Sequence, residues 1–149
     1  MYTINLQMKD YLAEWCTTHF GNPITISRES EESRLLRRFL DKQPSVCSLE
    51  YAGDYNIQLV IPTYHEKPPR VYNYLGERGK KVIVESFARL FASCLWREVG
   101  SVINPPCSKA ALLQAFMEKH GISDEHEDTL RKKLDRERRK YFILHNIST

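Results

Sequence analysis

Apolar side chains recur along the first part of the chain with two different periods, one typical of strands and one typical of helices. Residues 2–6 alternate apolar and polar side chains, which predicts a short strand. Over residues 8–20 the apolar side chains return every three or four positions, which predicts an amphipathic helix that ends at Gly21. A β-branched run at residues 24–26 predicts a second short strand.

A second helix is predicted next, followed by an extended segment. Ser30 is a suitable amino-terminal cap, and acidic and then apolar residues follow it at helical spacing until Pro44 limits the helix. Residues 46–61 alternate on both sides of a Gly-Asp pair at 53–54, which is the pattern of a hairpin. Residues 62–79 are polar and contain several prolines and glycines, which predicts a long surface loop.

The second half of the chain is expected to be helical. Residues 80–99 carry apolar side chains around most of a helix circumference, which predicts a central helix. After the break at residues 104–106, Ser108 caps a further predicted helix that Gly121 ends. A last helix is predicted from Ser123 or Asp124 to about Phe142.

We therefore expect an α+β fold that is predominantly helical, with about five helices. A small antiparallel sheet or hairpin is expected in the amino-terminal half, and a helical pair at the carboxyl end. The expected division is an α+β body over residues 1–103 and the helical pair over residues 104–149, which can pack as one domain. The length of 149 residues is usual for a single domain.

Composition and cysteine usage narrow the class of protein. With 42% hydrophobic and 28% charged residues, the chain has an ordinary globular composition, which excludes wholesale disorder. We expect no transmembrane helix, and the start of the chain lacks a secretory pattern. No two cysteines have the spacing of a zinc ligand pair, so we expect buried reduced thiols and a cytoplasmic protein. The cysteines are Cys16, Cys47, Cys94 and Cys107.

The net charge of +3 is mild, but the charge is concentrated near the carboxyl end. Residues 131–140 contain seven basic and two acidic side chains, so this decapeptide has a net charge of +5. Lys132, Arg136 and Arg139 recur at helical spacing and share one face. Arginine matches phosphate groups and guanine edges bidentately, which favours contact with DNA through this helix. The predicted contacts are Arg131, Lys132, Arg136, Arg138 and Arg139.

Two alternatives stay open for the charged segments. The basic helix has acids at its start and bases at its end, so it is also consistent with a solvated helix that complements its own dipole. A second predicted contact region combines basic side chains with tyrosines, which can stack on bases. It also fits a polar loop whose tyrosines cover the edge of the core. Its residues are Arg70, Tyr72, Tyr74, Lys80 and Lys81.

The segment 116–123, Phe-Met-Glu-Lys-His-Gly-Ile-Ser, resembles the turn of helix-turn-helix proteins. In that family a hydrophobic helix ends in glycine, and a hydrophobic residue and a helix cap come next. Here the next hydrophobic residue of the second helix, Leu130, comes three residues late, so we expect a longer turn. Residues 8–12 and 21–24 also look similar to small accessory proteins of bacterial mobile elements and phages. The resemblance implies DNA binding without catalysis.

The remaining residues provide little evidence for a catalytic site. His65-Glu66 lacks the second histidine of a zinc protease, and no nucleophile motif occurs. The set Asp54, Glu66 and Lys67 lacks the usual spacing of a metal-dependent nuclease. His126 lies among acids that point in different directions from a helix start, so they do not converge on an ion. We expect no enzyme activity, no cofactor and no metal ion.

These observations predict a non-enzymatic protein that binds double-stranded DNA, either a transcriptional regulator or an accessory factor of a mobile element. Binding should neutralise about four to six phosphates. The alternative is a protein-interaction or structural protein, phage-like in kind, whose carboxy-terminal helices dock on a partner or form a homodimer. The interface would then be carried by Leu130, Leu134, Tyr141, Phe142, Ile143 and Leu144.

Overall fold

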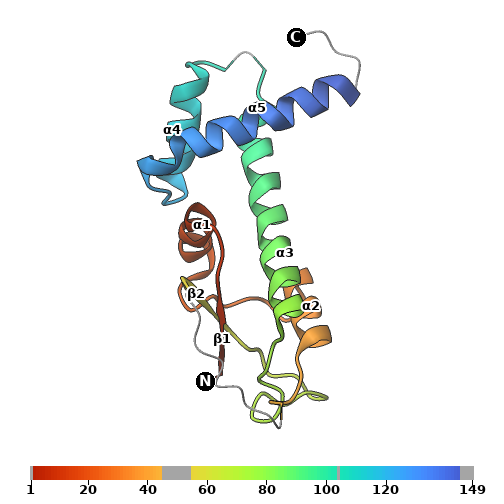
Figure 1. The fold of residues 1–149 in the computed structure, drawn as a ribbon. Helices are drawn as coiled ribbons and strands as arrows, with labels where there is room; N and C mark the ends of the chain where they lie inside the picture. The colour runs from red at the N-terminus through yellow and green to blue at the C-terminus, as the bar shows by residue number, and fades with distance from the viewer. Residues whose placement is uncertain (1, 45–54, 104, 145–149) are drawn as a thin grey trace. The chain divides into compact units, whose positions relative to one another are not determined.

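The computed structural model describes residues 2–44, 55–103 and 105–144, with Phe142 described by its backbone alone. Within these ranges it contains five α-helices and a two-stranded antiparallel sheet, which confirms the expected α+β class (Figure 1). The first strand of the expected hairpin and its turn at residues 53–54 lie outside the described residues.

The chain forms two compact units, residues 1–89 and residues 90–149. The division falls inside the longest helix, α3 (Glu77–Leu95). The expected domain boundary at residue 103 stays a prediction. None of the helices in the described ranges has the length and the apolar character needed to cross a membrane.

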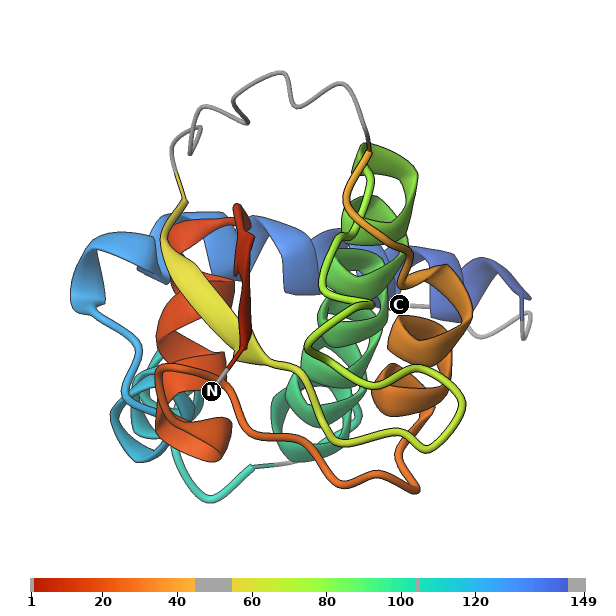
Figure 2. The same ribbon diagram turned by 90° about the horizontal axis from the view of Figure 1, so that it is seen from below.

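The sheet of the first unit joins two segments that are far apart in the sequence. Strand β1 (Thr3–Leu6) pairs antiparallel with β2 (Ile57–Val60), and the two lie side by side in Figure 2. Ile4 and Leu6 alternate with less buried neighbours, as do Ile57 and Leu59, so one face of the sheet is turned to the core.

The expected strand at residues 24–26 is reduced to a single bridge. Ile24 pairs in parallel with Leu59 on the free edge of β2, and its amide donates a hydrogen bond of 2.6 Å to the carbonyl of Gln58. The next amide, that of Thr25, donates instead to the carbonyl of Phe20. The pairing with β2 is limited to Ile24, although this residue is fully buried.

The predicted signals lie at the end of the first helix and at the start of the second. Helix α1 (Asp10–Phe20) ends at Gly21, whose φ of +85° lies in the region that favours glycine. Helix α2 (Glu31–Phe39) begins after Ser30, whose side chain accepts a hydrogen bond of 3.1 Å from the amide of Ser33. These local caps explain why the sequence pattern located these two ends, whereas α2 ends at Phe39, before the predicted limit at Pro44.

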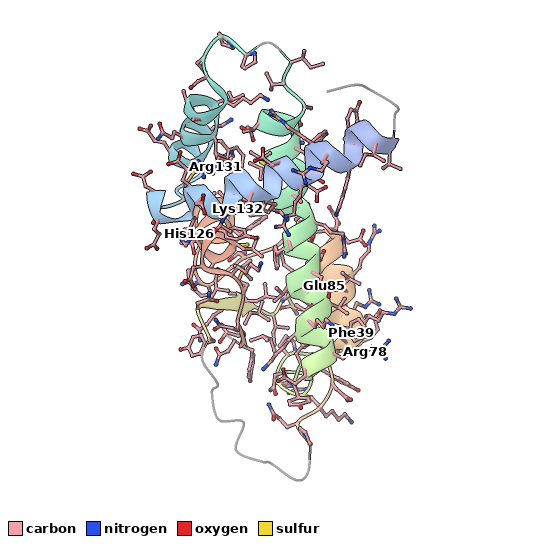
Figure 3. All side chains as sticks on the ribbon, turned by 45° about the horizontal axis from the view of Figure 1, so that its top comes forward. Phe39, Arg78, Glu85, His126, Arg131 and Lys132 are labelled. Carbon is pink, nitrogen blue, oxygen red and sulfur yellow. The ribbon has the colours of Figure 1, made fainter. Side chains whose placement is uncertain are left out.

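Gly79, which we expected in a surface loop, is buried in the first turn of α3. A Cβ atom at this position would lie 2.6 Å from Cδ1 of Leu75 and 3.0 Å from Cβ of Phe39. The glycine therefore allows close packing where α2 ends and α3 begins, the region marked by Phe39 and Arg78 in Figure 3. The helix accordingly starts at Glu77, earlier than the expected residue 80.

Two buried polar contacts fasten α2 within the first unit. Ser86 of α3 donates a hydrogen bond of 2.8 Å to Oε1 of Glu32. Tyr64 donates to the carbonyl of Ser33, and the two hydroxyl groups lie 2.7 Å apart. Burial raises the pKa of Tyr64 above its ordinary value, so the phenol keeps its proton and stays a donor. Each of these buried polar side chains thus has a partner, as the interior of a stable unit requires.

The second unit is helical. After α3 the chain makes one π-helical turn, η1 (Trp96–Gly100), followed by α4 (Lys109–Lys119), a 3₁₀ turn, η2 (Asp124–His126), and α5 (Glu127–Leu144). Both α4 and α5 pack on one another and on η1, and the two helices cross rather than run side by side (Figures 1 and 2). The core of this unit includes Phe91, Val99, Met117 and Leu130.

Candidate nucleic-acid interface

Helix α5 has an apolar face and a basic face. Leu130 is fully buried and Leu134 is buried, so these positions fix the side of the helix that packs on the rest of its unit. At 3.6 residues per turn, Lys132, Arg136 and Arg139 lie on the opposite side, and none of the three belongs to the buried core. The predicted sharing of one face therefore agrees with the burial pattern of the helix.

The start of the basic face contains one acid that pairs with two of the bases. Asp128 forms ion pairs with Lys132, at 3.0 Å, and with Arg131. Lys132 first, and then Arg131, hold the pKa of the Asp128 carboxyl below its ordinary value. Figure 3 labels Arg131 and Lys132 in the first half of α5. Because all three side chains are well exposed, these pairs are weak and can exchange for other partners.

Arg138 has a different environment from the other predicted contacts. Its guanidinium donates hydrogen bonds to the carbonyl of Gly100, at 3.1 Å, and to the carbonyl of Val99, at 3.2 Å. These carbonyls end the helical stretch of η1, where positive charge is favourable. The structure thus gives Arg138 a contact inside its own unit.

Arg136 and Arg139 are the most available cations of the set. Both are exposed, and neither makes a hydrogen bond or an ion pair within the part of the chain that the structure describes. Their separation of three residues places them about 4.5 Å apart along the helix axis. Two guanidinium groups on one side of a helix can contact neighbouring phosphates without losing any bond that holds the protein together.

The second predicted region is partly engaged in contacts of the first unit. The ammonium groups of Lys42 and Lys67 lie 5.6 and 5.8 Å from the ring centre of Tyr72. Tyr74 pairs through its backbone with Asp41. A role of Tyr72 in base stacking would therefore compete with two cation–π contacts.

The three cations of that region differ in their placement. Arg70 is exposed and precedes α3, whereas Lys80 and Lys81 belong to the first turns of that helix, with Lys80 half-buried. The structure thus distributes them over a loop and a helix.

The link between α4 and α5 is longer than a helix-turn-helix turn, as the late Leu130 led us to expect. Helix α4 ends at Lys119, Gly121 has a φ of +69°, and η2 precedes the start of α5 at Glu127. The first turn of α5 is acidic, which opposes the insertion of its amino-terminal end into a groove lined by phosphates. The middle of α5 is therefore better suited to contact DNA than its amino-terminal end.

A cavity of the first unit is a further concave feature near basic residues. It has a volume of about 260 Å³ and is lined by residues 28 and 29, by side chains of α2 and by residues 63–66. Arg37 pairs there with Glu66 at 2.7 Å, and Arg28 donates to the carbonyl of Thr63. These contacts satisfy two of its three arginines internally, so the cavity is a weaker candidate than the face of α5.

Three potential metal ligands lie close together in the second unit, although the sequence pattern did not predict this cluster. Sγ of Cys94 lies 2.9 Å from Oε2 of Glu98, and Nε2 of His120 lies 3.0 Å from the same oxygen. Burial opposes ionisation of Glu98, but hydrogen bonds from Cys94, Lys119 and His120 outweigh it and hold the pKa at about 2. The available signal was the four-residue spacing of Cys94 and Glu98, which places both on one helix face.

The expectation of buried thiols holds for Cys16 and Cys94, whereas Cys107 is exposed and Cys47 lies outside the described residues. Burial, and secondarily the charge of Glu32, raises the pKa of Cys16 to about 12. Cys16 is therefore a protonated thiol at neutral pH and is unsuited to act as a nucleophile.

Comparisons with family models, with curated proteins and with solved structures find no match to this chain.

Proposed function

We propose that the protein is a non-enzymatic nucleic-acid-binding protein that contacts double-stranded DNA through the exposed face of α5. The observation that carries the proposal is the pair Arg136 and Arg139, both exposed and without an ion pair among the described residues. Lys132 extends their face, and Arg131 flanks it. Control of transcription, or service to a mobile element, is the biological setting we propose for this contact.

The chemistry of the face supports contact with phosphates more than reading of bases. From Lys132 to Arg139 the helix rises about 10.5 Å, which spans about three base-pair steps. The acidic first turn is repelled by the DNA backbone, so the helix would lie along a phosphate track with its middle and carboxyl end closest to it. We leave Arg138 out of the proposed contact because its guanidinium caps η1.

The first prediction concerns the salt dependence of this binding. Neutralisation of about four phosphates releases condensed counterions, so the affinity for a duplex should fall about 100-fold between about 50 and about 200 mM salt. Fluorescence anisotropy with a labelled random-sequence duplex measures both affinities. If the folded protein fails to bind at the lower salt concentration, or if its affinity is independent of salt, the proposal is wrong.

The matched variants of that experiment locate the contact. The double variant Arg136→Glu, Arg139→Glu should abolish the salt-sensitive binding. The control Lys9→Glu, Lys109→Glu changes the net charge equally, and both of its sites are exposed residues at helix starts, where glutamate is favourable. It should retain most of the affinity. Equal losses in both variants would indicate attraction by net charge and contradict a contact at α5.

A second candidate function is self-association through the end of α5. Ile143 and Leu144 are 71% and 80% exposed, and exposed apolar groups of this kind mark interaction surfaces. Of the other residues expected in such an interface, Leu130 and Leu134 are buried within their own unit, and Tyr141 lies against Trp96. Among the described residues, any such interface is therefore confined to the last turn of the helix.

Light scattering tests this second candidate on the full chain without DNA. A dimer that dissociates in the Ile143→Lys variant would support it, because a charge at the centre of an apolar contact is costly to bury. Lys140→Gln, one turn earlier and also exposed, is the control that should leave the dimer intact. A monomeric wild type at micromolar concentration would rule this candidate out.

A further inference from the structure

We propose that Cys94, Glu98 and His120 form a binding site for a zinc ion in the second unit. One donor atom from each residue lies within 4.8 Å of the other two, and the three donors are a thiol, a carboxylate and an imidazole. Zinc prefers these ligand types, whereas the thiol disfavours magnesium and calcium. The site is independent of the proposed contact with DNA.

The distances between the donor atoms are close to those of a tetrahedral zinc site. Zinc lies about 2.3 Å from sulfur and about 2.0–2.1 Å from nitrogen or oxygen, so its ligands are roughly 3.3–3.6 Å from one another. Here the sulfur lies 3.9 Å from Nε2 of His120, and Oε2 of Glu98 lies 2.9 Å from the sulfur and 3.0 Å from Nε2. Shifts of a few tenths of an ångström would place all three donors around one ion.

The two oxygens of Glu98 have different contacts, which suits a carboxylate that binds through one oxygen. Oε2 makes the shortest contacts to Cys94 and His120. Oε1 lies 3.2 Å from Nε2 of His120 and accepts a hydrogen bond of 2.8 Å from the ammonium group of Lys119. Lys119 would keep this bond when Oε2 binds the ion and would thereby orient the ligand from outside, a common support for metal-binding carboxylates.

Charge and burial also favour a dication at this point. On binding, the thiol of Cys94 gives its proton to solvent, and the resulting thiolate and the Glu98 carboxylate together balance the two charges of the ion. His120 contributes its unprotonated Nε2, so the proton of the neutral ring is carried by Nδ1 when the ion is bound. Cys94 and His120 are buried, while the Glu98 side chain is 25% exposed, so an ion can enter from the side of Glu98. Three protein ligands leave a fourth position for water.

The backbone conformation at Glu98 is a second observation in favour of a metal site. Glu98 lies in η1, the π-helical turn that follows α3, and such turns occur often at functional sites. His120 is the cap residue directly after the last residue of α4. A bound ion would therefore join the end of one helical stretch to the end of the next.

Metal binding is tested directly on the full chain. After treatment with a chelator and its removal, the protein should bind one equivalent of Zn²⁺ in equilibrium dialysis. With Co²⁺ it should show visible bands typical of tetrahedral coordination and a charge-transfer band from the thiolate. The Cys94→Ser variant should lose the charge-transfer band and bind Zn²⁺ about 100-fold more weakly or worse. The Cys107→Ser variant, which alters an exposed thiol, should behave like the wild type.

The Glu98→Gln variant keeps the shape of the side chain and removes its charge, so it provides a second ligand test if Cys94→Ser is poorly folded. Circular dichroism establishes which variants are folded. The absence of stoichiometric Zn²⁺ binding by the folded wild type would overturn the proposal. It would also be overturned by a Co²⁺ spectrum without a thiolate band, or by equal affinity in Glu98→Gln. In those cases the cluster is a hydrogen-bonded network that joins η1 to α4.

Discussion

Replacing Phe87 with alanine is expected to lower the free energy of unfolding by about 3–5 kcal/mol. Phe87 is fully buried in α3, and its ring meets the ring of Phe20 edge to face at a centroid distance of 5.7 Å. Truncation removes a large buried apolar surface, leaves a cavity and deletes this aromatic contact. A loss of this size is a large fraction of the total stability of a domain of this length.

Chemical denaturation followed by circular dichroism measures this effect. Leu90→Ala is the matched control, because Leu90 lies on the same helix but is 40% exposed, and its truncation should cost less than about 1 kcal/mol. If Phe87→Ala were no more destabilising than Leu90→Ala, the assignment of Phe87 to the centre of the core would be wrong. The urea dependence should stay the same in both variants if they change only the folded state.

The helices were predictable from the sequence because their limits depend on local chemistry. Ser30 and Ser108 accept hydrogen bonds from the amides three residues later, and Gly21 and Gly121 have positive φ values. Each of these signals acts within a few residues, so no knowledge of the rest of the fold is needed to recognise it. The α+β class followed from the same reasoning.

Features that depend on distant contacts were not predictable in this way. β1 pairs with β2 across some fifty residues, and no local pattern identifies such a partner. Gly79 looked like part of a loop, whereas it is required by the close packing of Leu75 and Phe39. The expected strand around Ile24 pairs with β2 at one residue only, and that partner is distant in the sequence.

In the candidate site, too, some features follow from local spacing and others depend on tertiary packing. The basic face of α5 follows from helical spacing, so Lys132, Arg136 and Arg139 could be grouped before the structure was known. The contacts of Arg138 with the carbonyls of η1 depend on how the second unit packs, which its spacing does not reveal. The meeting of His120 with Cys94 and Glu98 likewise depends on the packing of helices that are separate in the sequence.

Leu130→Ala is expected to destabilise the second unit by about 2–5 kcal/mol, because Leu130 is fully buried on the face of α5 that packs on α4 and η1. Ile143→Ala removes a similar side chain from the same helix at a position that is 71% exposed, and its effect on stability should be near zero. Thermal unfolding followed by circular dichroism compares the two variants. Similar midpoints would contradict the assignment of the buried face.

The same variant separates the scaffold of α5 from its proposed contact with DNA. At temperatures where Leu130→Ala is still folded, Arg136 and Arg139 remain exposed on an intact helix, so its affinity for DNA should match that of the wild type. Affinity should then fall together with the helical signal as the variant unfolds, because binding requires the folded helix. Loss of affinity in the fully folded variant would mean that the apolar face itself contacts the ligand, which would contradict a contact through the basic face.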